Sequence, residues 1–193
     1  MKNRKFIFLF PFAVVFLLCS FALQTNSTKG LILWSADRPL TWKDFKVTQP
    51  ASAAFSALTH WEILFTSSYD GDSLVTTTDC YFNPNESKVK KDSRTDTFLL
   101  GHEQFHFNIA ELYTRKLRKA FSEAVVTKKD VNNKITKLYQ QYVNDCTKEQ
   151  DRYDNETNHS IKKPEQLKWQ ADIADQLKAL DAYDGDVVKI YVK

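Results

Sequence analysis

Two histidines and a glutamate in one short segment have the types and spacing for metal chemistry. His102 and His106 are four residues apart, and Glu103 directly follows the first of them. On a helix, this spacing puts both imidazoles on one face, one turn apart, where they can bind one metal ion. Glu103 then lies about 100° further round. Its carboxylate could take a proton from a zinc-activated water without binding the metal. The spacing therefore predicts a zinc site with Glu103 as the general base of a hydrolysis.

The surrounding sequence favours a metal site over two structural histidines. The periodicity predicts a helix that begins at Thr95 or Asp96, either of which can act as its N-cap, and continues to about residue 121. Its apolar positions continue the face of the two histidines, which should therefore be buried. Two buried histidines without a metal would each need a hydrogen-bond partner, which makes the structural alternative costlier.

A catalytic zinc site needs a third protein ligand. We expect His159, because it lies in a loop after the second predicted helix and can return to the site. The long metzincin motif would place a histidine at position 112, which is Leu112, so that class is excluded. The alternatives for the third ligand are Glu123, Asp154, Glu156 and His60.

Tyr153 is a second candidate catalytic residue. A phenol near the metal could donate a hydrogen bond to the oxyanion that forms during amide hydrolysis. The alternative is a packing role, because Tyr153 continues the helix face of Cys146 and Gln150.

The first 22 residues have the pattern of a secretory signal peptide. Lys2, Arg4 and Lys5 precede an apolar run over residues 6–18, and small residues follow it. We therefore expect a secreted or periplasmic protein whose residues 23–193 form a single domain, with no stable membrane insertion after cleavage. A lipoprotein or an uncleaved anchor is the less favoured alternative.

The net charge of the mature chain narrows the classes of binding partner. The formal net charge is +3, but the signal segment carries three positive side chains, so the mature chain is close to neutral. No basic stripe argues for nucleic acid, and the short basic run 88–91 is interpreted as a solvated loop. We expect a monomer.

The two cysteines of the mature chain could form a disulfide. Cys80 and Cys146 remain after signal cleavage, and an even pair in an exported chain suggests one disulfide, with two buried free thiols as the alternative.

The order of predicted elements indicates an α+β fold. Strands are expected at 31–34, 57–67, 73–82 and 187–192, and Asp70-Gly71 marks a hairpin between the second and third. Two helices are expected to follow the histidine helix, at 131–146 and 165–183, with a loop over 155–164 between them. We therefore expect a small, partly antiparallel sheet packed on the histidine helix and two further helices.

Four segments of the mature chain match the pattern of one family, at residues 38–45, 80–84, 101–113 and 153–159. Together they resemble a bacterial family of unknown function that is usually grouped with secreted zinc-dependent proteases of the zincin type. The resemblance spans nearly the whole mature chain, and it implies a zincin-like fold and proteolysis. Ser160 stands where the family pattern has glycine, and Phe105 stands at a position that is often small.

The function expected from these features is a zinc peptidase that hydrolyses peptide or protein substrates. Zinc would be held by His102, His106 and His159, and a strand between residues 57 and 82 would align the substrate through main-chain hydrogen bonds. Two alternatives remain: an amidase acting on cell-wall peptides, and a non-catalytic zincin-like protein that binds a partner. The presence of Glu103 argues against the second, because a binding protein needs no base there.

Overall fold

A long antiparallel hairpin forms the base of the molecule. The computed structural model describes residues 28–193, so the predicted signal peptide lies outside the described residues. Strands β4 (Trp61–Asp70) and β5 (Ser73–Phe82) pair along their full length, from Trp61 opposite Phe82 to Asp70 opposite Ser73. Gly71 adopts a φ of +58° at the turn, a conformation that glycine adopts without steric cost. The predicted hairpin is confirmed.

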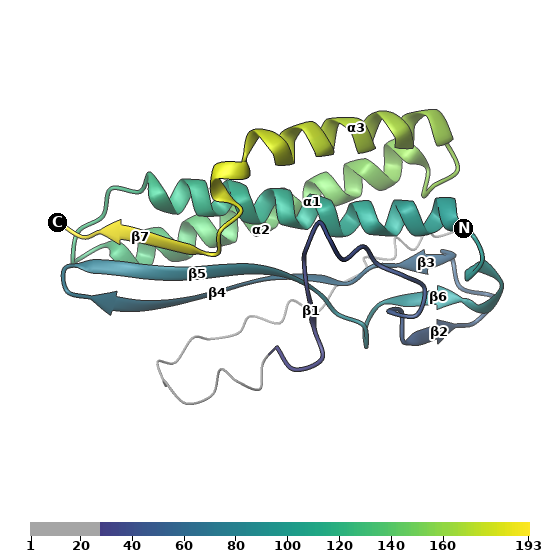
Figure 1. Cartoon of the computed structure of the whole chain (residues 1–193), viewed down its shortest axis with the longest axis horizontal. Coiled ribbons are helices and arrows are strands. Elements are labelled where there is room, and N and C mark those ends of the chain that lie inside the picture. The colour runs from purple at the N-terminus through teal and green to yellow at the C-terminus, as the bar shows by residue number, and fades with distance from the viewer. Residues whose placement is uncertain (1–27) are drawn as a thin grey trace, which may run out of the picture.

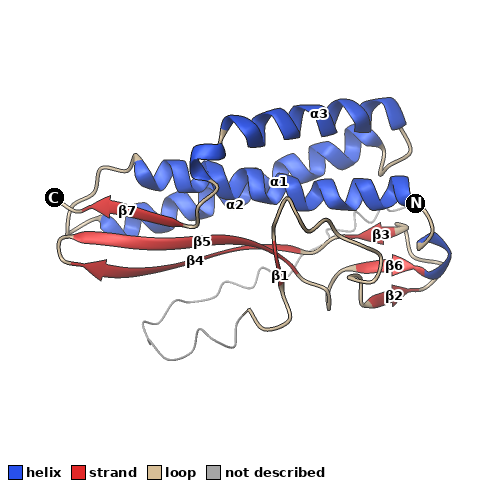
Figure 2. Cartoon of the chain, in the orientation of Figure 1, coloured by secondary structure: helices blue, strands red, loops and turns tan. Residues whose placement is uncertain are grey.

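Strand β5 is the centre of the larger sheet. Its second edge pairs with β7 (Val187–Tyr191) at one end and with β1 (Ile32–Leu33) at the other, and all these pairs are antiparallel. The smaller sheet has the order β2-β6-β3. In it, β6 (Lys88–Lys90) pairs in parallel with β2 (Val47–Gln49) and antiparallel with β3 (Ala57–Leu58). Figure 2 shows the two sheets at opposite ends of the molecule, on the same side of helix α1 (Thr97–Ser122).

Three helices cover the sheets. Helix α1 (Thr97–Ser122) lies directly over them, and α2 (Val131–Thr157) and α3 (Lys163–Ala179) pack against α1 (Figure 1). The Asp96 carboxylate caps α1 by accepting hydrogen bonds from the amides of Phe98 and Leu99, each at 2.9 Å. Two 3-10 turns, η2 (Lys91–Ser93) and η3 (Asp181–Tyr183), complete the described elements. None of the helices in the described part of the chain is long and apolar enough to cross a membrane.

This arrangement confirms the α+β prediction, with differences at several boundaries. The strand expected over 57–67 is divided into β3 and β4. Helix α2 continues to Thr157, so the expected loop over 155–164 is shorter than predicted. The basic run 88–91 is not a solvated loop: it contains β6, in which the Val89 side chain is fully buried.

The expected disulfide is not formed. Cys80 on β5 and Cys146 on α2 are both free thiols, and both are fully buried. Burial raises the pKa of each thiol, which keeps both neutral. They therefore act as small apolar side chains of the core, as the alternative interpretation of the cysteine pair required.

The second half of α1 carries a buried charge cluster that fixes its position. Arg118 is 3% exposed, and its guanidinium donates to the carbonyl of Thr78 on β5 at 2.7 and 2.9 Å. The same group donates to Glu111 Oε1 at 3.1 Å and to the carbonyls of Tyr183 and Asp184. Because one guanidinium joins α1, β5 and the segment after α3, these elements cannot shift independently.

This cluster predicts a large effect of a single substitution. Arg118→Met removes a buried cation, leaves three backbone carbonyls without this donor and leaves the Glu111 carboxylate with Arg115 as its remaining charged partner, so it should cost about 3 kcal/mol of unfolding free energy. Urea denaturation measures the change. Arg152→Met is the control, because Arg152 is 55% exposed and its contacts are the ion pairs with Glu149 and Glu156 and a cation–π contact with Trp169, and it should cost less than about 1 kcal/mol. Equal losses in the two variants would contradict the assignment.

Candidate metal centre

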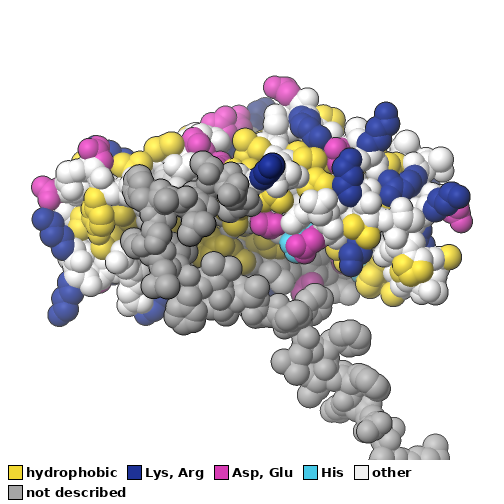
Figure 3. Space-filling view, turned by 90° about the horizontal axis from the view of Figure 1, so that it is seen from below, with side chains coloured by type: hydrophobic (Ala, Val, Ile, Leu, Met, Phe, Trp, Pro, Cys, Tyr) yellow, Lys and Arg dark blue, Asp and Glu magenta, His cyan; other side chains and the backbone are white. Residues whose placement is uncertain are grey.

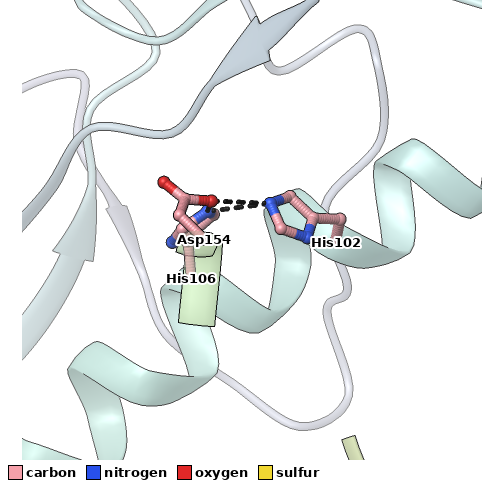
Figure 4. Close-up of side chains that lie close together, drawn as sticks. All are labelled: His102, His106 and Asp154. Carbon is pink, nitrogen blue, oxygen red and sulfur yellow. Dashed lines mark hydrogen bonds and ion pairs between the residues drawn. The ribbon is translucent and has the colours of Figure 1, made fainter. Parts of the chain in front are cut away.

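Two histidines of α1 and one aspartate of α2 converge on one point. The Nε2 atoms of His102 and His106 lie 3.2 Å apart, and Asp154 Oδ1 lies 3.0 Å from the first and 3.1 Å from the second. Figure 4 shows the carboxylate directed at both rings. Both histidines are buried, at 2% and 9% exposure. Their predicted position on the buried face of the helix is confirmed.

These three atoms form a set suited to a tetrahedral metal ion. Zinc binds imidazole nitrogen and carboxylate oxygen at roughly 2.0–2.2 Å, which places ligand atoms of a tetrahedral site roughly 3.3 Å apart. The separations of 3.0–3.2 Å in the cluster are close to that spacing. His102, His106 and Asp154 are the group of potential ligands that the described residues bring together. Two nitrogens and one oxygen also match the donor set of catalytic zinc sites, which leave a fourth position for water or substrate.

The protonation of the cluster is governed by the Asp154 carboxylate. Burial opposes ionisation of Asp154, but hydrogen bonds and charge attraction from the two histidines hold its pKa well below the usual range. Burial would lower the pKa of His106, yet the hydrogen bond and charge of Asp154, aided by Glu103 and Gln150, raise it to about 9. The pKa of His102 is lowered, mainly by burial. A metal ion must displace the His106 proton in order to bind there.

Gln150 fixes the orientation of His106. Its Nε2 donates to the main-chain carbonyl of His106 at 2.9 Å, which leaves its Oε1 to face His106 Nδ1 at 2.6 Å. Because an amide oxygen can only accept, Nδ1 carries the proton of this hydrogen bond. The Nε2 lone pair of the ring is therefore directed at the point shared with His102 and Asp154.

A second glutamine, on α3, is placed in the same way toward His102. Gln166 Nε2 donates to the carbonyl of Phe98 at 3.2 Å, so its Oε1 is the remaining acceptor. Gln166 Oε1 and His102 Nδ1 are both buried atoms without a hydrogen-bond partner, and the Gln166 side chain acts to raise the pKa of His102. An unpaired acceptor beside an unpaired ring nitrogen is a complementary pair, which favours the same tautomer for His102 as for His106.

Glu103 lies beside the cluster and is held by Thr59. The Thr59 hydroxyl donates to Glu103 Oε2 at 2.7 Å. Glu103 is 3% exposed, and burial raises the pKa of its carboxyl, against the opposing effects of His106 and Thr59. Glu103 nonetheless lines the same cavity as the two histidines. Its role as a general base stays a prediction.

Tyr153 lies behind the histidines. Its ring stacks on His102 with centroids 4.6 Å apart and an interplanar angle of 18°, and it contacts His106 and Trp169 edge-on. The side chain is fully buried and is not among the residues that line the cavity. Its hydroxyl has no hydrogen-bond partner among the described residues. This placement favours the packing role over the oxyanion-binding role.

His159 lies on the cavity wall next to Asp154. Its Nδ1 is 3.3 Å from Asp154 Oδ1, its side chain is 40% exposed, and its ring contacts Phe55 with centroids 4.5 Å apart. Asn158, His159 and Ser160 have φ of 49°, 49° and 76°, a left-handed run that is unusual for residues other than glycine. Strain of this kind persists where surrounding contacts hold it, and it is concentrated at functional sites.

The other candidate ligands are directed elsewhere. Glu123 follows the last turn of α1 and pairs with Lys119, roughly 25 Å along the helix from His106 at 1.5 Å per residue. Glu156 accepts a hydrogen bond from Trp169 Nε1 at 2.8 Å. His60 lies beside Glu62 and Glu86 and does not line the cavity.

The cluster opens into a cavity of about 810 Å³. Its lining includes residues 54–59, which contain β3, residues of α2, and residues 159–161. In the space-filling view from below, acidic side chains lie against the exposed histidine surface, and hydrophobic side chains are nearby (Figure 3). The volume is within the range of small-ligand and active-site pockets.

The sequence alone did not identify Gln150, Gln166 or Thr59 as parts of the site. Gln150 and Asp154 are four residues apart on α2, the same spacing as His102 and His106 on α1. Gln150 contacts His106, and Asp154 contacts both histidines, so the two helices present matching i, i+4 pairs to each other. That repeated spacing was the available signal, and it depends on extending the second helix beyond Cys146.

The role of Gln150 can be tested through metal affinity. Gln150→Leu removes the acceptor that orients His106, and loss of such a supporting partner should weaken zinc binding about 10–100-fold. Competition with a chromophoric chelator measures the affinity. Gln141→Leu is the matched control, because Gln141 is an exposed residue of α2 and should leave zinc binding unchanged. A similar weakening in both variants would show that Gln150 has no specific role.

Comparison with protein families identifies the family of this chain. No curated protein and no solved structure matches the chain. The model of the family described as "Bacterial protein of unknown function (DUF922)" matches residues 45–160, more than half of the chain. The matched region contains His102, Glu103, His106, Asp154 and His159. The chain therefore belongs to this bacterial family of unknown function.

Proposed function

We propose that the protein is a secreted zinc-dependent peptidase with a zincin-like active site. The observation that carries the proposal is the convergence of His102 Nε2, His106 Nε2 and Asp154 Oδ1 within 3.2 Å of one another, beside the buried carboxylate of Glu103. The export signal predicted over residues 1–22 supports an extracytoplasmic location. The resemblance of the motif segments to secreted zinc-dependent proteases supports the choice of amide bonds as substrate.

The residues at the site have separable roles in this proposal. His102, His106 and Asp154 would hold zinc, which supplies a lowered pKa for a coordinated water and polarises a carbonyl. Glu103 accepts the proton of the attacking water and delivers it to the leaving nitrogen. The Thr59 hydroxyl, at 2.7 Å from Glu103 Oε2, keeps that carboxylate oriented toward the cavity. Gln150 holds the His106 imidazole with its Nε2 directed at the metal, and Gln166 Oε1 would accept a hydrogen bond from His102 Nδ1 in the same tautomer.

Strand β3 offers a way to position an extended substrate. It is the last strand in the order β2-β6-β3, so one of its edges has no strand partner among the described residues. Ala57, Leu58 and the adjoining Thr59 line the cavity. A peptide that added to this edge would present its main chain alongside Glu103. We therefore assign to β3 the role of aligning the substrate, which the sequence predicted for a strand between residues 57 and 82.

A non-catalytic role for the cluster explains the site less well than the peptidase does. A binding protein needs no buried carboxylate beside two histidines, and burying Glu103 raises its pKa at a cost in stability. Such a cost is typical of sites where the ionisable group takes part in chemistry.

The proposed roles of zinc and of Glu103 are tested together. The purified protein should contain close to one zinc per chain, measured by atomic emission after removal of loosely bound metal. Glu103→Gln keeps the size of the side chain but removes the base, so hydrolysis of a mixed peptide library should fall at least about 100-fold. The variant should still bind one zinc. Undiminished hydrolysis by this variant, or a folded protein that takes up no zinc, would reject the mechanism.

The third ligand is tested by comparing three substitutions. Asp154→Ala removes the carboxylate that contacts both histidines, so it should lower zinc affinity by more than about 100-fold. His159→Ala should have a smaller effect, because His159 contacts Asp154 and is partly exposed. His60→Ala, outside the cavity, should have none. A larger loss for His159→Ala than for Asp154→Ala would reassign the third ligand to His159.

A further inference from the structure

Apart from His106, whose proton a bound metal would displace, the charged side chains that line the cavity are acidic. They are Asp96, Glu103, Asp151 and Asp154, and among the described residues no lysine or arginine lines it. One divalent cation offsets two of these charges at most, so the cavity stays negative with zinc bound. Asp151 is exposed and forms no ion pair with the described residues. Its charge is therefore directed at whatever enters the cavity.

The same cavity is lined by large exposed apolar side chains from two segments. Phe55 and Leu58, before β4, are 45% and 42% exposed, and Ile161, after α2, is 72% exposed. Exposed apolar side chains that gather in a concave site mark a surface that binds apolar groups. The Phe55 ring also contacts His159, which lies next to Asp154, so this apolar surface reaches the proposed metal-binding residues.

We infer that the cavity selects extended peptides with large apolar side chains and neutral or basic flanking residues, and disfavours acidic peptides. The inference rests on the proposed function, because it identifies the substrate class of the same site. An acidic peptide would place its carboxylates against Asp96, Asp151 and Asp154, and like charges brought together at short range are costly. Lysine or arginine side chains would meet those carboxylates favourably, and apolar side chains would cover Phe55, Leu58 and Ile161.

This preference also distinguishes between the two hydrolase hypotheses. Peptides rich in free carboxylates, such as an acidic cell-wall peptide, are poorly matched to a cavity without a lysine or arginine on its described walls. Protein segments of mixed composition, with apolar residues next to basic ones, are well matched. The charge of the cavity therefore favours a peptidase over an amidase acting on acidic cell-wall peptides.

The test measures binding separately from hydrolysis. Zinc-loaded Glu103→Gln protein is titrated against three fluorescent peptides of equal length: a Phe-Leu pair flanked by lysines, the same pair flanked by glutamates, and a Ser-Ser pair flanked by lysines. Fluorescence anisotropy at low salt should show the first binding about tenfold more tightly than either of the others. The advantage over the glutamate peptide should shrink as salt is raised. Equal or tighter binding of the glutamate peptide, or no binding of any peptide, would overturn the inference.

Substitutions in the cavity wall, each with a matched control elsewhere, test which residues cause the peptide preferences. Asp151→Lys should reduce the preference for lysine over glutamate flanks about threefold or more, and Ile161→Ser should reduce the preference for Phe-Leu over Ser-Ser. The controls are Asp175→Lys and Leu167→Ser, which make the same changes at exposed positions of α3 that do not line the cavity. Controls that change the preferences as much as the cavity variants would reject the assignment to the cavity walls.

Hydrolysis of the same peptides by the wild-type protein separates the two proposals. If Glu103→Gln protein binds as expected but the wild type cleaves none of the peptides, the peptidase proposal fails and the binding preference stands. If the wild type cleaves the glutamate-flanked peptide as fast as the lysine-flanked one, the peptidase proposal stands and the substrate preference is overturned.

Discussion

Helix α1 is buried between the sheets and two other helices, although many of its buried residues are polar. A buried polar group loses its contact with water and must find a partner inside the protein. Helices α2 and α3, strand β5 and Thr59 supply most of those partners, so the helix can occupy few other positions. The buried polar residues of α1 are His102, Glu103, His106, Glu111, Thr114, Arg115 and Arg118.

The two halves of α1 meet this constraint with different chemistry. In the second half, Arg115 and Arg118 share the Glu111 carboxylate and bond to the carbonyl groups of surrounding segments, which gives a fully partnered network. In the first half, the buried polar atoms have fewer hydrogen-bond partners, and His102 Nδ1 has none among the described residues. A rigid charged network one or two turns from an incompletely satisfied cluster is the arrangement expected where a structural scaffold holds a functional site.

How much the sequence reveals depends on whether a feature is local. The spacing of His102, Glu103 and His106 is a property of one helix, so their common face and burial could be predicted. The choice between Asp154 and His159 depends on how α2 packs on α1, and a helix that continues to Thr157 rather than ending near Cys146 brings the aspartate inward. The smaller sheet was missed because its strands have only two or three residues, too few for an alternating pattern.

A carboxylate in the cluster explains how the two histidines and Asp154 can converge so closely. Two neutral imidazoles and a carboxylate oxygen all present lone pairs to one point and would repel one another. A proton on His106 removes that repulsion, and the Asp154 charge is the main reason why the pKa of this histidine rises to about 9 despite burial. A divalent cation satisfies the same lone pairs when it displaces the proton. The third histidine expected from the sequence would lack the negative charge that holds the proton there, so a carboxylate at this position allows the three groups to converge and to present the donor set that a metal ion would use.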